Sequence, residues 1–171
     1  YAVMSFLMTA TPINMHITEN YSLNKTGIVI QLHIVSMFLP SLITGNLLKK
    51  FGHSKIIYAG VTFYILTILL SLLQPSFFNY LFSLIFLGIG WNFLYLSGTG
   101  LLVVSYREEE KFKAQGFNDI LVFSTQALAS LSAGYMLSMT SWKTMNLIAI
   151  PFLILIVFSS VRADLSKDGK L

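Results

Sequence analysis

Cysteine is absent from the 171 residues of this chain. Its absence excludes disulfide bonds, thiol nucleophiles and cysteine-ligated metals, and it leaves the redox compartment undetermined. Charged residues are also scarce, at 11% against roughly 25% in an average soluble domain. With 55% hydrophobic residues and a mean hydropathy of +0.73, the composition excludes an ordinary soluble domain and predicts an all-α, polytopic membrane protein.

Six long apolar segments predict six transmembrane helices, because a helix of about 20 apolar residues crosses roughly 30 Å of hydrocarbon. The predicted spans cover residues of about 1–16, 27–46, 56–73, 79–105, 115–138 and 142–161. Together they would form one six-helix bundle over residues 1–171. The first segment has neither an initiator Met nor a basic n-region, so we expect the chain to begin inside a transmembrane helix and to be a fragment.

The net charge of +4 does not indicate a nucleic-acid partner, because the basic residues lie in short loops and not on one soluble face. Their distribution indicates topology instead. Nine of the 11 Lys and Arg occur at alternate loops and the C-terminal tail, and the other two are Lys25 and Lys143. This asymmetry predicts a multi-pass protein of the cell (inner) membrane whose C-terminus and N-terminal end are both cytoplasmic.

A short basic loop between the second and third spans contains the motif Gly45-x-Leu47-x-x-Lys50-x-Gly52. Its spacing and position resemble the loop signature of the major facilitator superfamily, in which a glycine ends one helix and a second glycine turns the chain into the next. The copy departs from the pattern at Lys49, where the family usually has an acidic residue. Such a departure is typical of the C-terminal half. We expect Gly52 to adopt a positive φ or to approach a neighbouring helix closely.

The charged loop from Arg107 to Gln115, followed by Gly116, is similar to the loop between the fourth and fifth helices of a half in the same family. The resemblance implies a secondary active transporter, built from two six-helix bundles that move a small organic solute by alternating access. Its partners would be the solute, the lipid bilayer and the missing N-terminal half, with protons as a candidate coupling ion. It implies no enzyme activity, cofactor or metal. The gating candidates are Gly45, Lys50, Gly52, Arg107 and Asp119.

A polar and aromatic stripe in the fourth span is the main candidate for a cavity wall. Gly88, Trp91, Asn92, Tyr95 and Thr99 follow helical spacing and share one face. Trp91 and Tyr95 could stack on a planar or apolar solute while Asn92 supplies hydrogen bonds. The alternative is that Asn92 ties two helices together and the aromatic rings only pack.

Three further residues are cavity candidates with the same ambiguity. His33 in the second span is either an interhelical hydrogen-bonding group or a proton switch. Thr11 lies on a stripe of methionines in the first span, which indicates adaptable packing or a promiscuous binding surface. Gln126 in the fifth span shares a face with Asp119 and Ser130.

Only seven residues are acidic, and Asp119 alone lies within a predicted span, about one turn inside the cytoplasmic end of the fifth helix. A carboxylate at that depth needs a partner, which makes it a candidate functional residue. The basic ends at Arg107, Lys113 or the Lys49/Lys50 loop could pair with it in one conformation only. A gating role is favoured over proton carriage, because a position near the interface stays hydrated and ionised.

Two other classes remain as alternatives. An intramembrane protease would explain Leu96-Ser97-Gly98, but every histidine precedes Ser97 and no His-Glu-x-x-His pattern occurs. A six-helix structural or regulatory membrane protein without transport would have the same topology as a transporter half.

Overall fold

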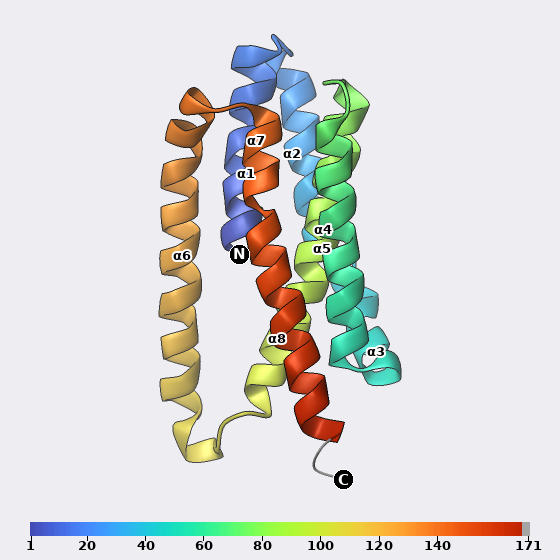
Figure 1. Ribbon diagram of the computed structural model, residues 1–171, viewed down its shortest axis with the longest axis vertical. Coiled ribbons are helices and arrows are strands. Elements are labelled where there is room, and N and C mark those ends of the chain that lie inside the picture. Colours follow the sequence, from blue (N-terminus) through green and yellow to red (C-terminus); the bar gives the residue numbers. More distant parts are fainter. Residues whose placement is uncertain (169–171) are drawn as a thin grey trace.

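The structure, a computed structural model, describes residues 1–168 and is helical along almost all of them (Figure 1). No β-strand occurs within these residues, in agreement with the predicted all-α class. The helices are α1 (Ala2–Ile13), the π-helical η1 (Asn14–Thr18), α2 (Leu23–Phe38), α3 (Ser41–Phe51), α4 (His53–Leu72), α5 (Phe77–Val103), the 3₁₀ turn η2 (Glu108–Glu110), α6 (Lys111–Met139), α7 (Trp142–Ile148) and α8 (Ile150–Asp168).

Within residues 1–168, four stretches of helix are long and apolar enough to cross a membrane: His53–Leu72, Phe77–Val103, Glu108–Met139 and Trp142–Arg162. The pair α2 and α3, bent by 40°, would be a fifth if it forms one broken span. The first predicted span corresponds to α1, whose 12 residues fall short of the roughly 20 that a bilayer requires. The structure therefore confirms several membrane-length helices, and the count of six stays a prediction.

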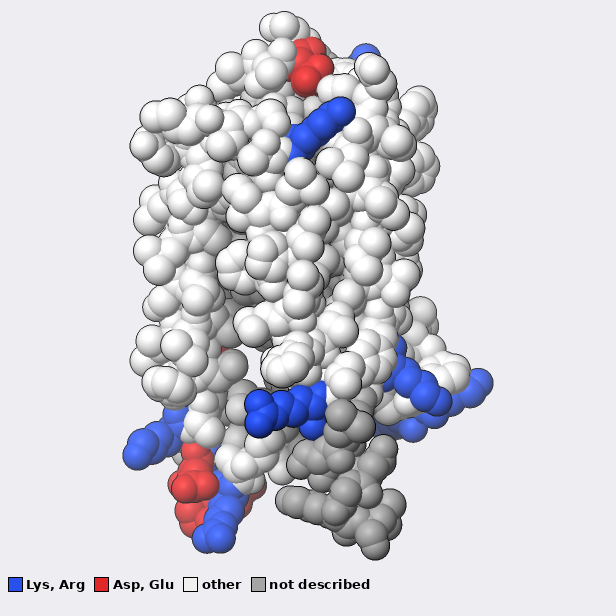
Figure 2. All heavy atoms as spheres, viewed as in Figure 1, with Lys and Arg blue, Asp and Glu red and all other residues white. Residues whose placement is uncertain are grey.

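The helices run roughly along one axis, with α5 at the centre (Figure 1). The most extensive contacts join α4 to α5 and α2 to α5, and α1 packs mainly on α6. The turns η1–α2, α4–α5 and α6–α7 lie at one end of the bundle. The α3–α4 turn and η2 lie at the other end, which we call the basic end. Figure 2 shows most Lys and Arg side chains gathered there. The basic residues at this end whose side chains the structure describes are Lys49, Lys50, Lys55, Arg107, Lys111, Lys113 and Arg162.

The break between α2 and α3 follows from Pro40, which has no amide hydrogen to continue the helical ladder. Side chains satisfy carbonyl groups beside the break. Thr44 Oγ1 donates to the Pro40 carbonyl at 2.8 Å, and Asn92 Nδ2 from α5 donates to the Met37 carbonyl at 2.8 Å. The bend is therefore held in place from a neighbouring helix.

The turn between α3 and α4 consists of Gly52 alone, with φ 81° and ψ 165°. The prediction of a positive φ at Gly52 is confirmed, and a backbone in this region is essentially restricted to glycine. Gly45, in contrast, does not end a helix. It lies within α3, and a Cβ added there would meet no atom within 4 Å. The helix continues past Gly45, and the backbone leaves the right-handed helical region only at Gly52. The positive charges of Lys49 and Lys50 in the last turn stabilise the helix by interacting with the negative end of its dipole.

Two glycines of α5 allow neighbouring backbones to approach closely. A Cβ on Gly88 would clash with Ser36 Oγ and would lie 2.8 Å from the His33 carbonyl oxygen on α2. A Cβ on Gly90 would lie 2.9 Å from the Gly60 carbonyl oxygen on α4. The absence of side chains at these points lets α5 pack tightly against helices on two sides.

Replacing Gly88 with Ala should therefore destabilise the protein, because the added methyl group has backbone of α2 on one side and cannot be displaced cheaply. Overpacking of this kind costs on the order of 1–3 kcal/mol. Gly98→Ala is the matched control in the same helix, since a Cβ there would meet nothing within 4 Å. Thermal unfolding of the full-length protein in detergent measures the difference, and equal stability of the two variants would show that α2 and α5 do not approach as described.

Candidate functional site

An aromatic cluster lies on the face of α5 that sequence spacing indicated. The rings of Trp91 and Tyr95 stack with centroids 5.0 Å apart and an interplanar angle of 11°. Tyr1 meets them edge-on, at 5.1 Å from Trp91 and 5.2 Å from Tyr95. Phe38 of α2 contacts Trp91 at 6.0 Å. Four rings from three parts of the chain therefore gather at one place, with Trp91 at their centre.

A pocket of about 230 Å³ adjoins this cluster, lined by Tyr1, Tyr64, Trp91 and Tyr95 on one side and by apolar residues of α8 on the other. Trp91 is 4% exposed, whereas Tyr95 is 38% exposed. The Trp91 Nε1 is buried without a hydrogen-bond acceptor among the described residues. The pocket thus offers flat aromatic faces, which suit a planar solute.

Asn92, one residue further along α5, points into a different environment. Its Nδ2 donates to the Met37 carbonyl at 2.8 Å and to Ser41 Oγ at 2.7 Å. Its Oδ1 lies 2.8 Å from Thr44 Oγ1, whose single hydrogen is shared between this oxygen and the Pro40 carbonyl. The side chain is 1% exposed. With its amide engaged by α2 and α3, Asn92 has little capacity left for a solute, and the arrangement favours an interhelical tie.

Two other cavity candidates are also engaged by protein groups. His33 is fully buried, and its Nδ1 lies 2.7 Å from the Leu84 carbonyl oxygen on α5. Because a carbonyl only accepts, Nδ1 carries the proton in this contact. Thr11 is fully buried as well, and its hydroxyl donates to the Leu7 carbonyl of its own helix at 2.7 Å. Neither side chain lines the pocket beside Trp91.

Asp119 and Gln126 lie on the face of α6 that turns toward α1. Further along this face, Ser130 Oγ lies 3.2 Å from Thr9 Oγ1 of α1. The Gln126 Oε1 is buried without a donor among the described residues. Asp119 is exposed and close enough to interact electrostatically with Tyr1. The polar face of α6 therefore approaches the aromatic cluster.

The depth of Asp119 differs from the prediction. Because α6 begins at Lys111 and not near residue 115, Asp119 lies about 12 Å along the helix, more than two turns from its start. Among the side chains that the structure describes, those of residues 1–162, the single ion pair joins Lys111 to Glu108 at 3.5 Å. Among these side chains, Asp119 forms no ion pair with Arg107, Lys113 or the lysines of α3.

The remaining gating candidates lie at the basic end. Lys50 is exposed, and its ammonium group lies 5.2 Å from the ring centroid of Phe51. Arg107 is exposed and precedes η2 in an extended conformation. The aromatic cluster, in contrast, lies about halfway along α5, so the two sets of candidates form distinct regions.

The serine that suggested a protease lies beside a histidine in space. His53 Nδ1 approaches the Ser97 carbonyl oxygen at 3.2 Å, and Ser97 Oγ is buried without a partner among the described residues. A nucleophile and its base would need a bond between the ring and the hydroxyl. No group of three or more potential metal ligands occurs among the described residues.

Several site residues were not found from the sequence. Ser41, Thr44 and Tyr64 were missed because their partners lie on other helices. The same holds for the bond from Asn14 Nδ2 to the Tyr80 hydroxyl, 2.6 Å long. The available signal was the presence of small or polar residues inside apolar spans, which marks a helix contact but does not say with which helix.

Membrane-length helices, a one-residue turn flanked by lysines and a charged segment before α6 together define a polytopic protein of transporter type. The sequence profile of the Major Facilitator Superfamily matches residues 1–168, and the chain belongs to this family. The predicted family is confirmed, and it indicates a transporter and not an enzyme. No solved structure matches the chain significantly.

Curated relatives agree with this assignment. The chain is 37% identical over 157 residues to the riboflavin transporter RfnT of Brucella anthropi. The aligned residues make up 92% of this chain and 39% of RfnT. It is 32% identical over 147 residues to the uncharacterized MFS-type transporter YddS of Bacillus subtilis and 33% identical over 148 residues to YdeG of the same organism. The chain spans 34% to 39% of the length of these relatives.

The hydrogen bonds of Asn92 lead to a prediction. Asn92→Ala should lower the thermal stability of the full-length protein, because it leaves the Met37 carbonyl without its Asn92 donor and removes the hydrogen bonds to Ser41 and Thr44. A buried carbonyl that loses its donor costs roughly 1–3 kcal/mol. Solute affinity should stay near the wild-type value. Thr99→Ala is the control, since Thr99 is exposed and bonds only to its own helix. Reduced affinity with unchanged stability would instead assign Asn92 to solute binding.

Proposed function

We propose that the full-length protein containing this chain is a secondary active transporter that moves a small organic solute by alternating access. This chain would supply one six-helix half, and an N-terminal half of the same protein would supply the other. The family match over residues 1–168 carries the proposal. In such a transporter two bundles rock around a site near the bilayer midplane, and the aromatic cluster lies about halfway along α5.

The proposed solute is riboflavin or another flat heteroaromatic compound. The relative named as a riboflavin transporter is 37% identical over 92% of this chain. The stacked rings of Trp91 and Tyr95, with the edge of Tyr1 beside them, would accept a planar ring system, since offset stacking and edge contacts are the favoured aromatic geometries. Asn92, Thr11 and His33 would support the wall without touching the solute.

The proposed location is the cell (inner) membrane, with the basic end and the C-terminus in the cytoplasm. Support comes from the distribution of positive charge, since seven described Lys and Arg lie at the basic end and Lys25 and Lys143 at the other. A structural or regulatory six-helix protein is the alternative, and it would carry no solute flux.

Transport is tested with the full-length protein in proteoliposomes supplied with labelled riboflavin. Saturable accumulation is expected. Tyr95→Leu should weaken apparent affinity roughly two- to tenfold, the contribution of one aromatic pair, whereas Tyr95→Phe should retain it. Phe82→Leu is the control, because Phe82 is exposed on α5 outside the cluster. Flux of other solutes but not of riboflavin would reject the solute class, and absence of any solute-dependent flux would favour the structural alternative.

For Asp119 we propose a gating role. Its carboxylate is unpaired with the basic end here and would form an ion pair in the opposite conformation, with Arg107, Lys113 or the lysines of α3 as partners. Asp119→Asn should then change the transport rate and the populations of inward- and outward-open states while pH coupling is retained. A proton carrier would instead lose pH-driven accumulation and keep solute exchange. Glu109→Gln in η2 is the control, and wild-type behaviour of Asp119→Asn in both assays would reject both roles.

A further inference from the structure

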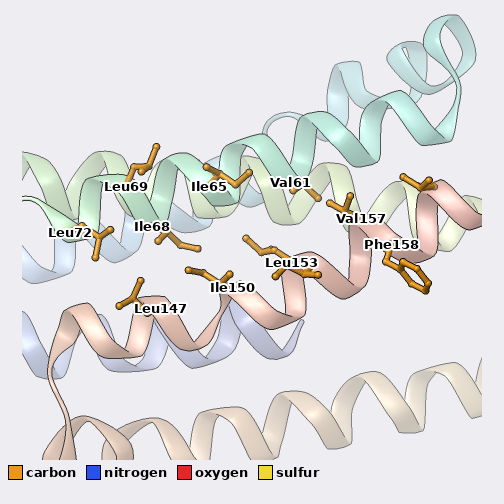
Figure 3. A pocket seen from close by; sticks show the side chains of 12 residues that line it. Val61, Ile65, Ile68, Leu69, Leu72, Leu147, Ile150, Leu153, Val157 and Phe158 are labelled. Atoms are coloured by element: carbon orange, nitrogen blue, oxygen red, sulfur yellow. The ribbon is translucent and has the colours of Figure 1, made fainter.

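A long groove separates α4 from α8 on the outer surface of the bundle. Its volume is about 610 Å³, and every residue that lines it is apolar. Figure 3 shows the two rows of side chains that form its walls. They include Val61, Ile65 and Leu72 from α4 and Ile150, Leu153 and Val157 from α8.

The groove lies between helices of membrane length, so its surroundings are hydrocarbon and not water. Ile65 and Ile154 on its walls are 46% and 63% exposed. From Ile150 to Val161 the wall formed by α8 is about 16 Å long, which is half of the roughly 30 Å hydrocarbon core. This is the depth of one leaflet, and it matches a single extended acyl chain.

The two walls run in opposite directions, and their register relates the groove to the basic end. Val61 lies opposite Val157, and Leu72 lies toward Leu147 (Figure 3). Each step toward the basic end lowers the residue number on α4 and raises it on α8. Continuing this register past the last lining residue places Lys55 and Arg162 at nearly the same depth. Both side chains are exposed.

The lining residues of the groove include no Asp or Glu, and none occurs in 53–72 or 142–162. Asp164 follows Arg162 on α8, but residues two positions apart do not face each other on a helix. Arg162 directly follows Val161, the last lining residue of α8, and Lys55 lies less than two turns before Val61. Long basic side chains at helix ends extend toward the lipid headgroups, and a guanidinium group binds a phosphate through two parallel hydrogen bonds. The mouth of the groove is therefore suited to a phosphate and its lumen to a hydrocarbon chain.

We infer that the groove between α4 and α8 binds an anionic phospholipid, with one acyl chain along the apolar walls and the phosphate between Lys55 and Arg162. An anionic headgroup fits better than a zwitterionic one, because the amine of a zwitterionic lipid offsets the attraction of the phosphate to two cations. The lipid would fill the space that α8 leaves beside α4 and brace α8 against the rest of the bundle.

The experiment uses native mass spectrometry of the delipidated full-length protein, to which phosphatidylglycerol or phosphatidylcholine with identical acyl chains is added. Wild type should retain phosphatidylglycerol in preference to phosphatidylcholine. Lys55→Gln and Arg162→Gln should each reduce retention roughly fivefold, the contribution of one basic residue near an anionic surface. Lys49→Gln with Lys113→Gln is the control, since it removes two exposed cations from the same end but away from the groove. Equal losses in control and test variants would overturn the inference in favour of general surface charge.

The groove itself is tested by filling it. Ile65→Trp and Ile154→Trp should reduce phosphatidylglycerol retention although Lys55 and Arg162 remain. Leu131→Trp, on the exposed face of α6, is the matched control. Unchanged retention in the filled variants would reject the acyl-chain site, and a protein dimer in place of a lipid adduct would show that a second copy covers the groove. If the filled variants do not fold, Lys55→Gln and Arg162→Gln still test the proposed lipid site, because both residues are exposed and their replacement should not impair folding.

Discussion

The close approach of α5 to its neighbours is the constraint on which the rest of the structure depends. At Gly88 and Gly90 the backbones of α2 and α4 come so near that a single methyl group would meet carbonyl oxygen atoms. Apolar side chains gain little by leaving lipid for a helix interface, so packing of this density is what makes association favourable in a membrane. The polar bonds follow from it. His33 reaches the Leu84 carbonyl, and Asn92 reaches α2 and α3, only because the helix axes are close.

Adjacent residues of α5 serve different purposes as a result. Trp91 and Asn92 differ by about 100° around the helix, and this rotation is enough to direct one toward the aromatic cluster and the other toward the break at Pro40. A stripe that looks uniform in the sequence is divided in space. One edge contacts neighbouring helices and holds the wall in position, and the other edge presents aromatic faces to a pocket.

The sequence predicts the features that depend on one segment at a time. Apolar length located α4, α5 and the α7–α8 segment, and the need for a positive φ at Gly52 could be inferred from its place in a tight basic turn. Prediction from the sequence is wrong or incomplete where a feature depends on a second segment of the chain. The second span is predicted to end at about residue 46, but α3 continues to Phe51. Asp119 is predicted about one turn inside the fifth helix, but α6 begins at Lys111, so Asp119 lies more than two turns from its start. The partners of Asn92 could not be assigned, since a polar side chain in a span does not specify which helix will bond to it.

The single residue that joins α3 to α4 leaves no slack between them. A connection of several residues could absorb a change in the tilt of α3 by uncoiling or stretching, but one glycine can only rotate about its two backbone torsions. The other end of α3 is bounded by the break at Pro40, where the helical ladder is interrupted. α3 is therefore a short helix joined directly to α4 at one end and held by the hydrogen bonds of Asn92 at the other. A displacement of its lysine-bearing end would therefore be transmitted to α4 without a flexible loop to absorb it.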